Sequence, residues 1–364
     1  MERNMSENSV IINKIPSPTW SWLKMNASSL EIDGAFSEIL PEERNLSDEI
    51  RKSRSVSGLS KTELYEKLSS SAGKGVEELS ENACGSPVVY TIEKKVSRPV
   101  VLSFCASDKT RAVSHVVLHA LEGAEATVIF LFGSDINDSG FIVSRTVSVL
   151  ERNARLHVVK AQILGSGFTY VDDTSFACGE NASASVSLVS LGASSAYSAV
   201  NAALSSYKSS FSLDMGYFCA KGQKLDMNHV VNHFGKKSDC MMRVKGTLCD
   251  EAFKTYRGTI DFKNGCAGST GDEQEETLIL SPSCVNNSIP VILCDEEDVS
   301  GEHGASIGRI SDEVLFYMQT RGIGKKEAEM ILARAKVQSV VSLIQDEDVQ
   351  QAIEERMSEV FIDE

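Results

Sequence analysis

The sequence predicts a mainly β fold with helical segments at both ends. From about residue 86 to 295, short runs of Val, Ile, Phe, Thr, Ser and Ala are broken by Gly, Asn, Asp and Lys, a composition typical of strands and turns. After Ser311 the apolar residues recur at helical spacing. We therefore expect an N-terminal, partly helical segment over 1–85, a β core over 86–310 and a C-terminal helical segment over 311–364.

A weak internal repeat bears on the kind of β fold. Ala124, Ala154 and Ala182 each lie in a polar corner before an apolar run, at spacings of 30 and 28 residues. Stacked coils of a β-solenoid produce such repeats, because each coil buries its inward face against the next. A β-sandwich explains the strands nearly as well, since later polar corners, such as 235–237 and 249–251, fall closer together. The residues alone leave both folds open.

Composition restricts the function. The chain has 364 residues, 36 of them basic and 51 acidic, and its net charge of −15 opposes general binding to nucleic acid or to anionic membranes. No apolar run reaches the ~20 residues that span a bilayer, and the first residues lack the apolar core of a secretory signal, so we expect a cytoplasmic protein. The nine cysteines form no CxxC pair and no zinc spacing, which indicates reduced, mostly buried thiols.

The N-terminal segment offers two local signals. Trp20 and Trp22 follow two prolines and are expected to anchor this segment to a core. A short helix is expected over 60–68, with Ser60 as its N-cap and Glu63 completing a capping box.

The C-terminal segment is expected to form three helices. The first starts at Ser311 and ends at Gly322, with an apolar stripe made of Val314, Leu315, Tyr317 and Met318. The second and third have stripes made of Ala328, Ile331, Leu332 and Ala335, and of Ile353, Met357 and Val360. From Val340 to the end there are eight acidic residues and one basic residue.

His303 is the strongest candidate for chemistry. It lies in the polar run 302–306, and glycines at 301, 304 and 308 permit a tight loop around the imidazole. A histidine in such a loop is either a turn residue or a metal ligand. As a ligand it would have to be neutral and oriented by a hydrogen bond through its other ring nitrogen.

The stretch around His303 resembles the C-terminal signature of the SufB/SufD family of iron–sulfur cluster assembly scaffolds. In that family a His-Gly-Ala loop leads into a Phe-Tyr helix and then Arg-Gly-Ile, here 303–305, 316–317 and 321–323. The resemblance covers roughly residues 225 to 335. Its upstream segments are His229–Gly235, Lys245–Gly246, Tyr256–Gly258 and Gln274–Leu280.

This resemblance implies a right-handed parallel β-helix core with helical flanks, which decides for the solenoid. It also implies a scaffold subunit of a Suf-type assembly complex, which pairs with a SufB-like subunit through the β-helix and with a SufC ATPase through roughly 311–360. A homodimer of the isolated chain is possible in this family. An iron–sulfur cluster would be held transiently at the SufB-like interface, with His303 as a possible ligand. No GxxxxGK[ST] loop occurs, so ATP hydrolysis is expected from the partner and no catalysis from this chain.

The sequence departs from SufB at two positions. A SufB cysteine in a Gln-Cys-Asp segment aligns with 274–276, which reads Gln-Glu-Glu, and a SufB glutamate after the histidine aligns with Gly304. The chain therefore resembles SufD more closely, and assembly of a cluster by this chain alone is in doubt. Cys284 and Cys294 flank the region and are expected to be structural thiols.

Other readings remain open beside this one. His229 and His233 are expected on a strand, on the same side but ~13 Å apart, which excludes a shared metal and favours structural or solvated roles. The segment 321–332 looks like a helix-hairpin-helix and would bind nucleic acid. A β-helix carbohydrate-active enzyme is the third reading.

Overall fold

The computed structural model describes residues 9–17, 23–56, 59, 64 and 68–361. Trp20, Trp22 and the capping residues Ser60 and Glu63 lie outside the described residues, as does most of the helix predicted over 60–68.

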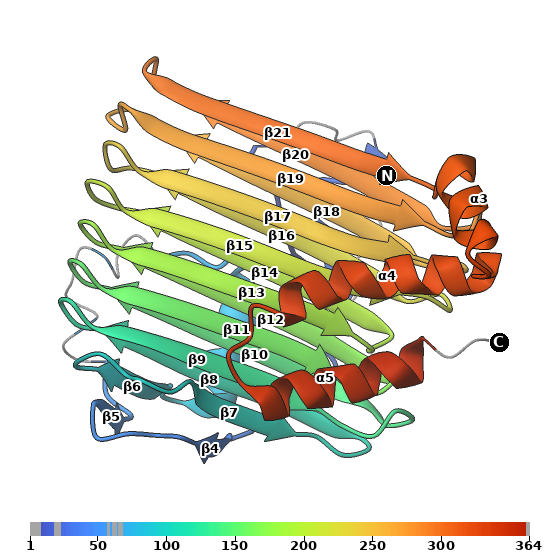
Figure 1. Cartoon of the computed structure of the whole chain (residues 1–364). Helices are drawn as coiled ribbons and strands as arrows, with labels where there is room; N and C mark the ends of the chain where they lie inside the picture. The colour runs from blue at the N-terminus through green and yellow to red at the C-terminus, as the bar shows by residue number, and fades with distance from the viewer. Residues whose placement is uncertain (1–8, 18–22, 57–58, 60–63, 65–67, 362–364) are drawn as a thin grey trace.

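Strands that follow one another along the chain alternate between two parallel sheets (Figure 1). Sheet I contains β6 (Val88–Ile92), β8 (Thr110–Ala120), β10 (Ser139–Leu150), β12 (Gly167–Cys178), β14 (Ser195–Leu204), β16 (Lys224–His233), β18 (Phe253–Phe262) and β20 (Val285–Cys294). Sheet II contains β7 (Val100–Cys105), β9 (Glu125–Gly133), β11 (Arg155–Ile163), β13 (Ser183–Leu191), β15 (Ser210–Cys219), β17 (Asp239–Leu248), β19 (Ser269–Ile279) and β21 (Val299–Gly308). Each pair of strands, one from each sheet, makes one coil, so the chain forms a β-solenoid, and the sandwich alternative is wrong.

The repeated corners explain why the coils stack. Ala124, Ala154 and Ala182 are fully buried in three successive corners, as the repeat predicts. The residue before each alanine has positive φ, 70° at Gly123, 58° at Asn153 and 53° at Asn181, and glycine and asparagine tolerate this conformation best. Backbone hydrogen bonds then join corner to corner, for example from Arg155 N to Ala124 O at 2.8 Å. Each corner therefore fixes the position of the next.

The hydrophobic core fills the space between the sheets. In a parallel ladder, register partners point to the same side, so inward side chains stack in columns along the solenoid. One column in sheet II runs through Val100, Val128, Val158, Val186, Leu213 and Met242, all buried. The same column continues into Glu273 and His303, where it becomes polar.

The two ends of the solenoid differ. At the N-terminal end, β5 (Ile50–Ser53) pairs antiparallel with β6 and β4 (Glu42–Arg44) pairs antiparallel with β7, so both edges of the first coil are covered. At the other end, β20 and β21 are the last strands of their sheets within the part of the chain that the structure describes. We call this pair of strands the open end.

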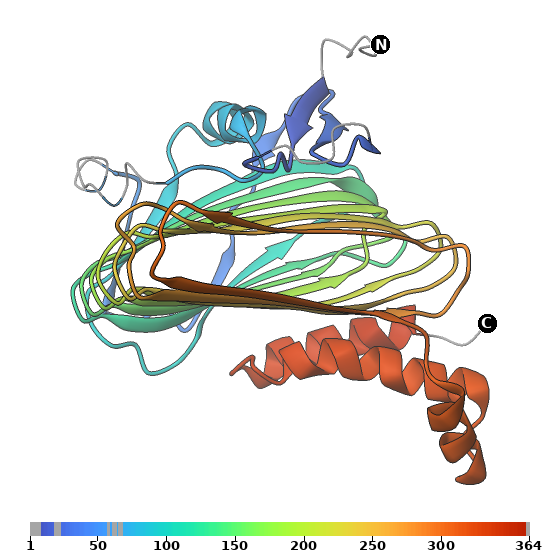
Figure 2. The same ribbon diagram turned by 90° about the horizontal axis from the view of Figure 1, so that it is seen from above.

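N-terminal elements cover the outer face of sheet I (Figure 2). They are β1 (Ser9–Ile12), β2 (Ser28–Glu31) and α2 (Lys74–Cys84), while β3 (Ser37–Glu38) joins sheet I itself by pairing with β8. A buried ion pair lies beneath the β1–β2 hairpin, from Arg257 Nη1 to Asp226 Oδ1 at 2.7 Å. Arg257 also donates from Nε to the carbonyl of Met25 at 2.6 Å, so sheet I binds the N-terminal segment directly.

C-terminal helices lie on the outer face of sheet II (Figure 2). They are α4 (Lys325–Val341) and α5 (Glu347–Val360), whereas α3 (Asp312–Thr320) packs against α4 and extends away from the sheet. Ser311 caps α3, as predicted, by accepting a hydrogen bond from Val314 N at 3.3 Å. The stripe predicted for α4 is wrong in part, because Ile331 and Ala335 are exposed and the helix packs through Val337 and Val340 instead. No described helix combines the length and hydropathy needed to cross a bilayer.

Candidate functional site

His303 lies on β21, in the last coil of the solenoid. The glycine-rich run around it forms this edge strand and not the tight loop expected from the sequence. The imidazole occupies an inward position, because its register partner Glu273 on β19 is buried between the sheets. No further coil follows among the described residues, so His303 itself is exposed. The histidine is thus accessible at the open end.

Glu273 is a buried carboxylate next to this histidine. Burial raises the pKa of Glu273 to about 7, with the nearby charge of Glu275 acting in the same direction. The carboxylate packs against Gly258 of β18, where an added Cβ would overlap its oxygens. Gly258 therefore creates the space that Glu273 occupies. Near neutral pH this carboxyl can either donate or accept a proton.

A second cluster of polar side chains lies inside the solenoid near the open end. Glu275, also inward on β19, is ion-paired with Lys254 of β18 inside the solenoid. Lys254 Nζ also donates to Asn286 Oδ1 at 2.9 Å, and Thr277 Oγ1 lies 3.1 Å from Glu275 Oε1. The side chains of Lys254 and Glu275 are almost completely buried. Partners of this kind offset the cost of burying the two charges.

The outer face of the open end is hollowed beside His303. Gly304 is the register partner of Gln274, and a Cβ on Gly304 would meet no atom within 4 Å. The resulting groove has a volume of about 430 Å³. Its lining residues are Asp272, Gln274, Glu275, Glu276, Glu302, His303, Gly304, Ala305 and Ser306. The missing side chain at Gly304, one of the two departures from SufB, thus leaves an open acidic groove.

The other two candidate histidines lie in the core. His229 and His233 are fully buried inward residues of β16, as expected for a strand. Burial lowers the pKa of His229 to about 3 and that of His233 to about 4, so both are neutral at pH 7. His229 lies edge-on to Tyr256, with ring centroids 5.5 Å apart, and His233 stacks on Phe262 at 4.7 Å. Their role is structural, and the solvated alternative is wrong.

The cysteines are free thiols, but fewer are buried than the sequence suggests. Four of the nine are buried, three are intermediate, and Cys105 and Cys294 are exposed. Cys284 donates to the carbonyl of Asp250 at 3.4 Å, and Cys294 to that of Glu296 at 3.0 Å. Within the described residues, no three His, Cys, Asp or Glu side chains are grouped so as to hold a metal ion.

The helix α3 presents apolar side chains to solvent. None of its residues is buried, and Phe316 and Tyr317 are 68% and 59% exposed. The following helix α4 is held to sheet II, since Lys336 Nζ lies 2.5 Å from Glu276 Oε2 and Lys245 Nζ lies 3.0 Å from Glu276 Oε1. The solenoid thus carries a firmly attached helix next to an exposed aromatic one.

Comparison with known protein families identifies the kind of protein to which this solenoid, with its open end, belongs. The model for the SufBD core domain, described as SUF system FeS cluster assembly, matches residues 104–336. The chain belongs to the SufBD family. The match covers the coils from β8 onward together with the open end, α3 and most of α4, so it includes both the groove beside His303 and the exposed helix α3.

Individual SufBD relatives agree with this assignment. The chain is similar to the iron–sulfur cluster assembly protein SufD of Bacillus subtilis, 31% identical over 33% of this chain and 28% of the relative. It is also similar to SufD of Escherichia coli, 24% identical over 66% of this chain and 57% of the relative. A SufBD family protein of Mycobacterium leprae is 25% identical over 71% of this chain and 68% of the relative. The matches to the two SufD proteins thus span about a quarter to somewhat over half of those relatives.

Family membership makes this chain a Suf-system protein of iron–sulfur cluster assembly. Sequence reasoning singled out His303 but missed Glu273, its register partner, and the buried ion pair of Lys254 and Glu275. The sequence signal for these carboxylates is the acidic run over 272–276 in β19. Within it, positions 273 and 275 share one face of the strand. The segment 321–332, which resembles a helix-hairpin-helix in sequence, consists of the α3–α4 connection and the start of α4. It lies inside the matched domain.

Proposed function

We propose that this chain is a SufD-like, non-catalytic scaffold subunit of a Suf-type complex, which binds a SufB-like subunit through the open end. The asymmetry of the solenoid is the observation that carries this proposal. The N-terminal end finishes in the short antiparallel strands β4 and β5, of three and four residues, whereas the parallel strands β20 and β21, of ten residues each, leave long outer edges without a described partner. Uncovered strand edges are sites of pairing with another chain.

His303 serves in this proposal as a ligand at the interface. The nascent cluster is the cargo of the complex and is held transiently between the subunits. An imidazole that is exposed in the free chain and covered in the complex suits this task, because the partner can complete the set of ligands. Its register partner Glu273 places a carboxyl group beside the imidazole, in the same end of the solenoid.

The helical segment α3–α5 binds a SufC-type ATPase in the same proposal. Support comes from Phe316 and Tyr317, which expose aromatic surface on a helix that buries none of its residues. Exposed aromatic side chains of this kind are typical of protein interfaces. ATP hydrolysis then occurs in the partner, and motion of the partner is transmitted to sheet II through α4.

Two variants test the two surfaces separately, and each is the control for the other. Gly304→Arg puts a long side chain into the groove at the open end, at a position where an added Cβ meets no atom within 4 Å, and Phe316→Ser/Tyr317→Ser removes the aromatic surface of α3. The tagged chain is purified from its own cells at low salt. We expect Gly304→Arg to lose the SufB-like partner and the α3 double variant to lose the ATPase. Retention of both partners by both variants, or their absence from the wild type, contradicts the proposal.

A further inference from the structure

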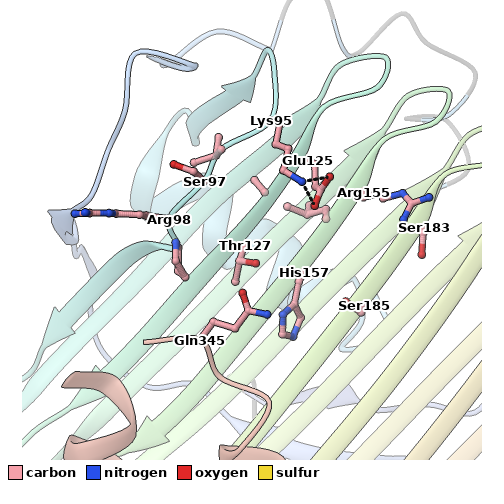
Figure 3. A pocket seen from close by; sticks show the side chains of 14 residues that line it. Lys95, Ser97, Arg98, Glu125, Thr127, Arg155, His157, Ser183, Ser185 and Gln345 are labelled. Atoms are coloured by element: carbon pink, nitrogen blue, oxygen red, sulfur yellow. Dashed lines mark hydrogen bonds and ion pairs between the residues drawn. The ribbon is translucent and has the colours of Figure 1, made fainter. Parts of the chain in front are cut away.

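A second concavity lies on the outer face of sheet II, far along the solenoid from the open end (Figure 3). Its floor is formed by three neighbouring strands, β9, β11 and β13. Two rows of register partners make this floor, first Glu125, Arg155 and Ser183, then Thr127, His157 and Ser185. The loop 95–99 forms one wall and Gln345 from the α4–α5 connection forms another. The volume is about 330 Å³.

The floor is polar only where the helices leave the sheet uncovered. Further along the same strands, Ile129, Val159 and Val189 point outward into the apolar cluster beneath α4 and α5. The floor residues precede these apolar residues by two to six positions along each strand and carry hydroxyl, imidazole or charged groups. The pocket is therefore a distinct polar recess at the border of the helix layer.

Positive charge dominates this recess in a chain whose net charge is −15. Three cationic side chains, Lys95, Arg98 and Arg155, line it together with a single carboxylate, Glu125. Lys95 Nζ lies 3.0 Å from both oxygens of Glu125. Neither Arg98 nor Arg155 forms an ion pair with any described carboxylate. The guanidinium of Arg155 is therefore available to an external anion, and that of Arg98 is not held by any described carboxylate.

Neutral donors complete the recess. His157 lies between Thr127 and Ser185 on adjacent strands, which are spaced by about 4.8 Å. Its Nε2 lies 3.0 Å from Ser187 Oγ, which orients the ring. Burial lowers the pKa of His157, although the charge of Asp214 opposes this effect. Hydroxyl and imidazole N–H groups of this kind hydrogen-bond to oxyanions.

We propose that this recess binds a small tetrahedral oxyanion of the phosphate class, either free phosphate or the phosphate group of a monoester. Arg155 and Lys95 contact the anion from one side, and Thr127, His157 and Ser185 contact it from the floor. In Figure 3 the guanidinium of Arg98 extends away from the floor, so this residue contributes only after its side chain rotates. Walls on more than one side favour a small ion over an extended acidic peptide.

Calorimetric titration of the full-length chain at constant ionic strength tests this proposal. The probes are inorganic phosphate, glycerol 3-phosphate and, as a test of simple screening, chloride. The variant is Arg155→Gln. The matched control is Arg152→Gln, which removes the same charge from the preceding corner, where Arg152 is paired with Glu122 at 3.0 Å.

We expect saturable binding of phosphate to the wild type, weakened by about tenfold or more in Arg155→Gln and unchanged in Arg152→Gln. Tighter binding of glycerol 3-phosphate identifies a monoester as the ligand, and equal binding identifies the phosphate group alone. The proposal is overturned if the wild type shows no saturable binding, if chloride competes equally, or if both arginine variants weaken binding to the same extent.

Discussion

Glu273 and His303 are register partners on the last two strands of sheet II, at the end of a column whose six preceding members are Val, Leu or Met. This column thus changes from apolar to ionisable at its last two members. An apolar column needs only stacking neighbours, whereas a carboxyl and an imidazole need hydrogen-bond partners. The open end is therefore where this column exposes an ionisable side chain, His303, to solvent.

The raised pKa of Glu273 makes its effect on stability depend on pH. The pKa rises from 4.5 to about 7 on folding, so the protonated form favours the native state. The stabilising contribution is complete below about pH 4.5 and is lost as the pH rises through about 7. Glu273→Gln, which is always neutral, should therefore raise the free energy of unfolding at pH 8 by up to about 3 kcal/mol.

Urea denaturation of the wild type and of Glu273→Gln at pH 4.5 and pH 8 measures this difference. The variant Glu302→Gln is the control, since Glu302 is an exposed outward residue of β21 and should change nothing at either pH. A Glu273→Gln variant that is no more stable than the wild type at pH 8 would show that this carboxylate is well solvated in the folded chain.

Gly258→Ala should destabilise the fold because the added methyl group overlaps the carboxylate of Glu273. The cost of such overpacking is about 1–3 kcal/mol. Gly304→Ala is the matched control, since nothing lies within 4 Å of its added Cβ. Thermal denaturation should show a lower Tm for the first variant and an unchanged Tm for the second. Equal Tm values for the two variants would contradict the packing described here.

Arg257→Met should release the N-terminal hairpin from sheet I. The substitution leaves the carboxylate of Asp226 buried without its cationic partner, which costs about 3–5 kcal/mol. Limited proteolysis should then cleave the chain between residues 9 and 31 faster than in the wild type. The double variant Arg257→Met/Asp226→Leu removes both charges and should recover much of the lost stability. If cleavage is as slow in Arg257→Met as in the wild type, the ion pair does not hold the hairpin.

The sequence contained enough local information for the corners of the solenoid and for the first C-terminal helix. Ala124, Ala154 and Ala182 occupy equivalent positions because each coil repeats the same turn, so a repeat along the chain becomes a stack in space. The start of α3 at Ser311 was also predictable, because a cap is a contact between residues only three positions apart. Such signals involve neighbours along the chain.

Features that depend on distant partners could not be predicted in this way. The choice between solenoid and sandwich needed the resemblance to a family, because parallel and antiparallel strands have similar compositions. The burial of Glu273 depends on Gly258 in the other sheet, and the recess at His157 brings Lys95 together with Gln345. For α4, the helix has more than one apolar stripe, and only the position of sheet II decides which one is covered.

Reconstitution of the complete complex tests the central claim, that His303 acts in cluster assembly at an interface. The chain is combined with the SufB-like subunit and the ATPase from its own cells, and iron and sulfide are supplied. Cluster formation is followed by visible absorbance. The account predicts that His303→Ala still assembles into the complex but forms little cluster, whereas Glu180→Ala, which alters an exposed corner far from the open end, forms as much as the wild type. Normal cluster formation by His303→Ala would contradict it.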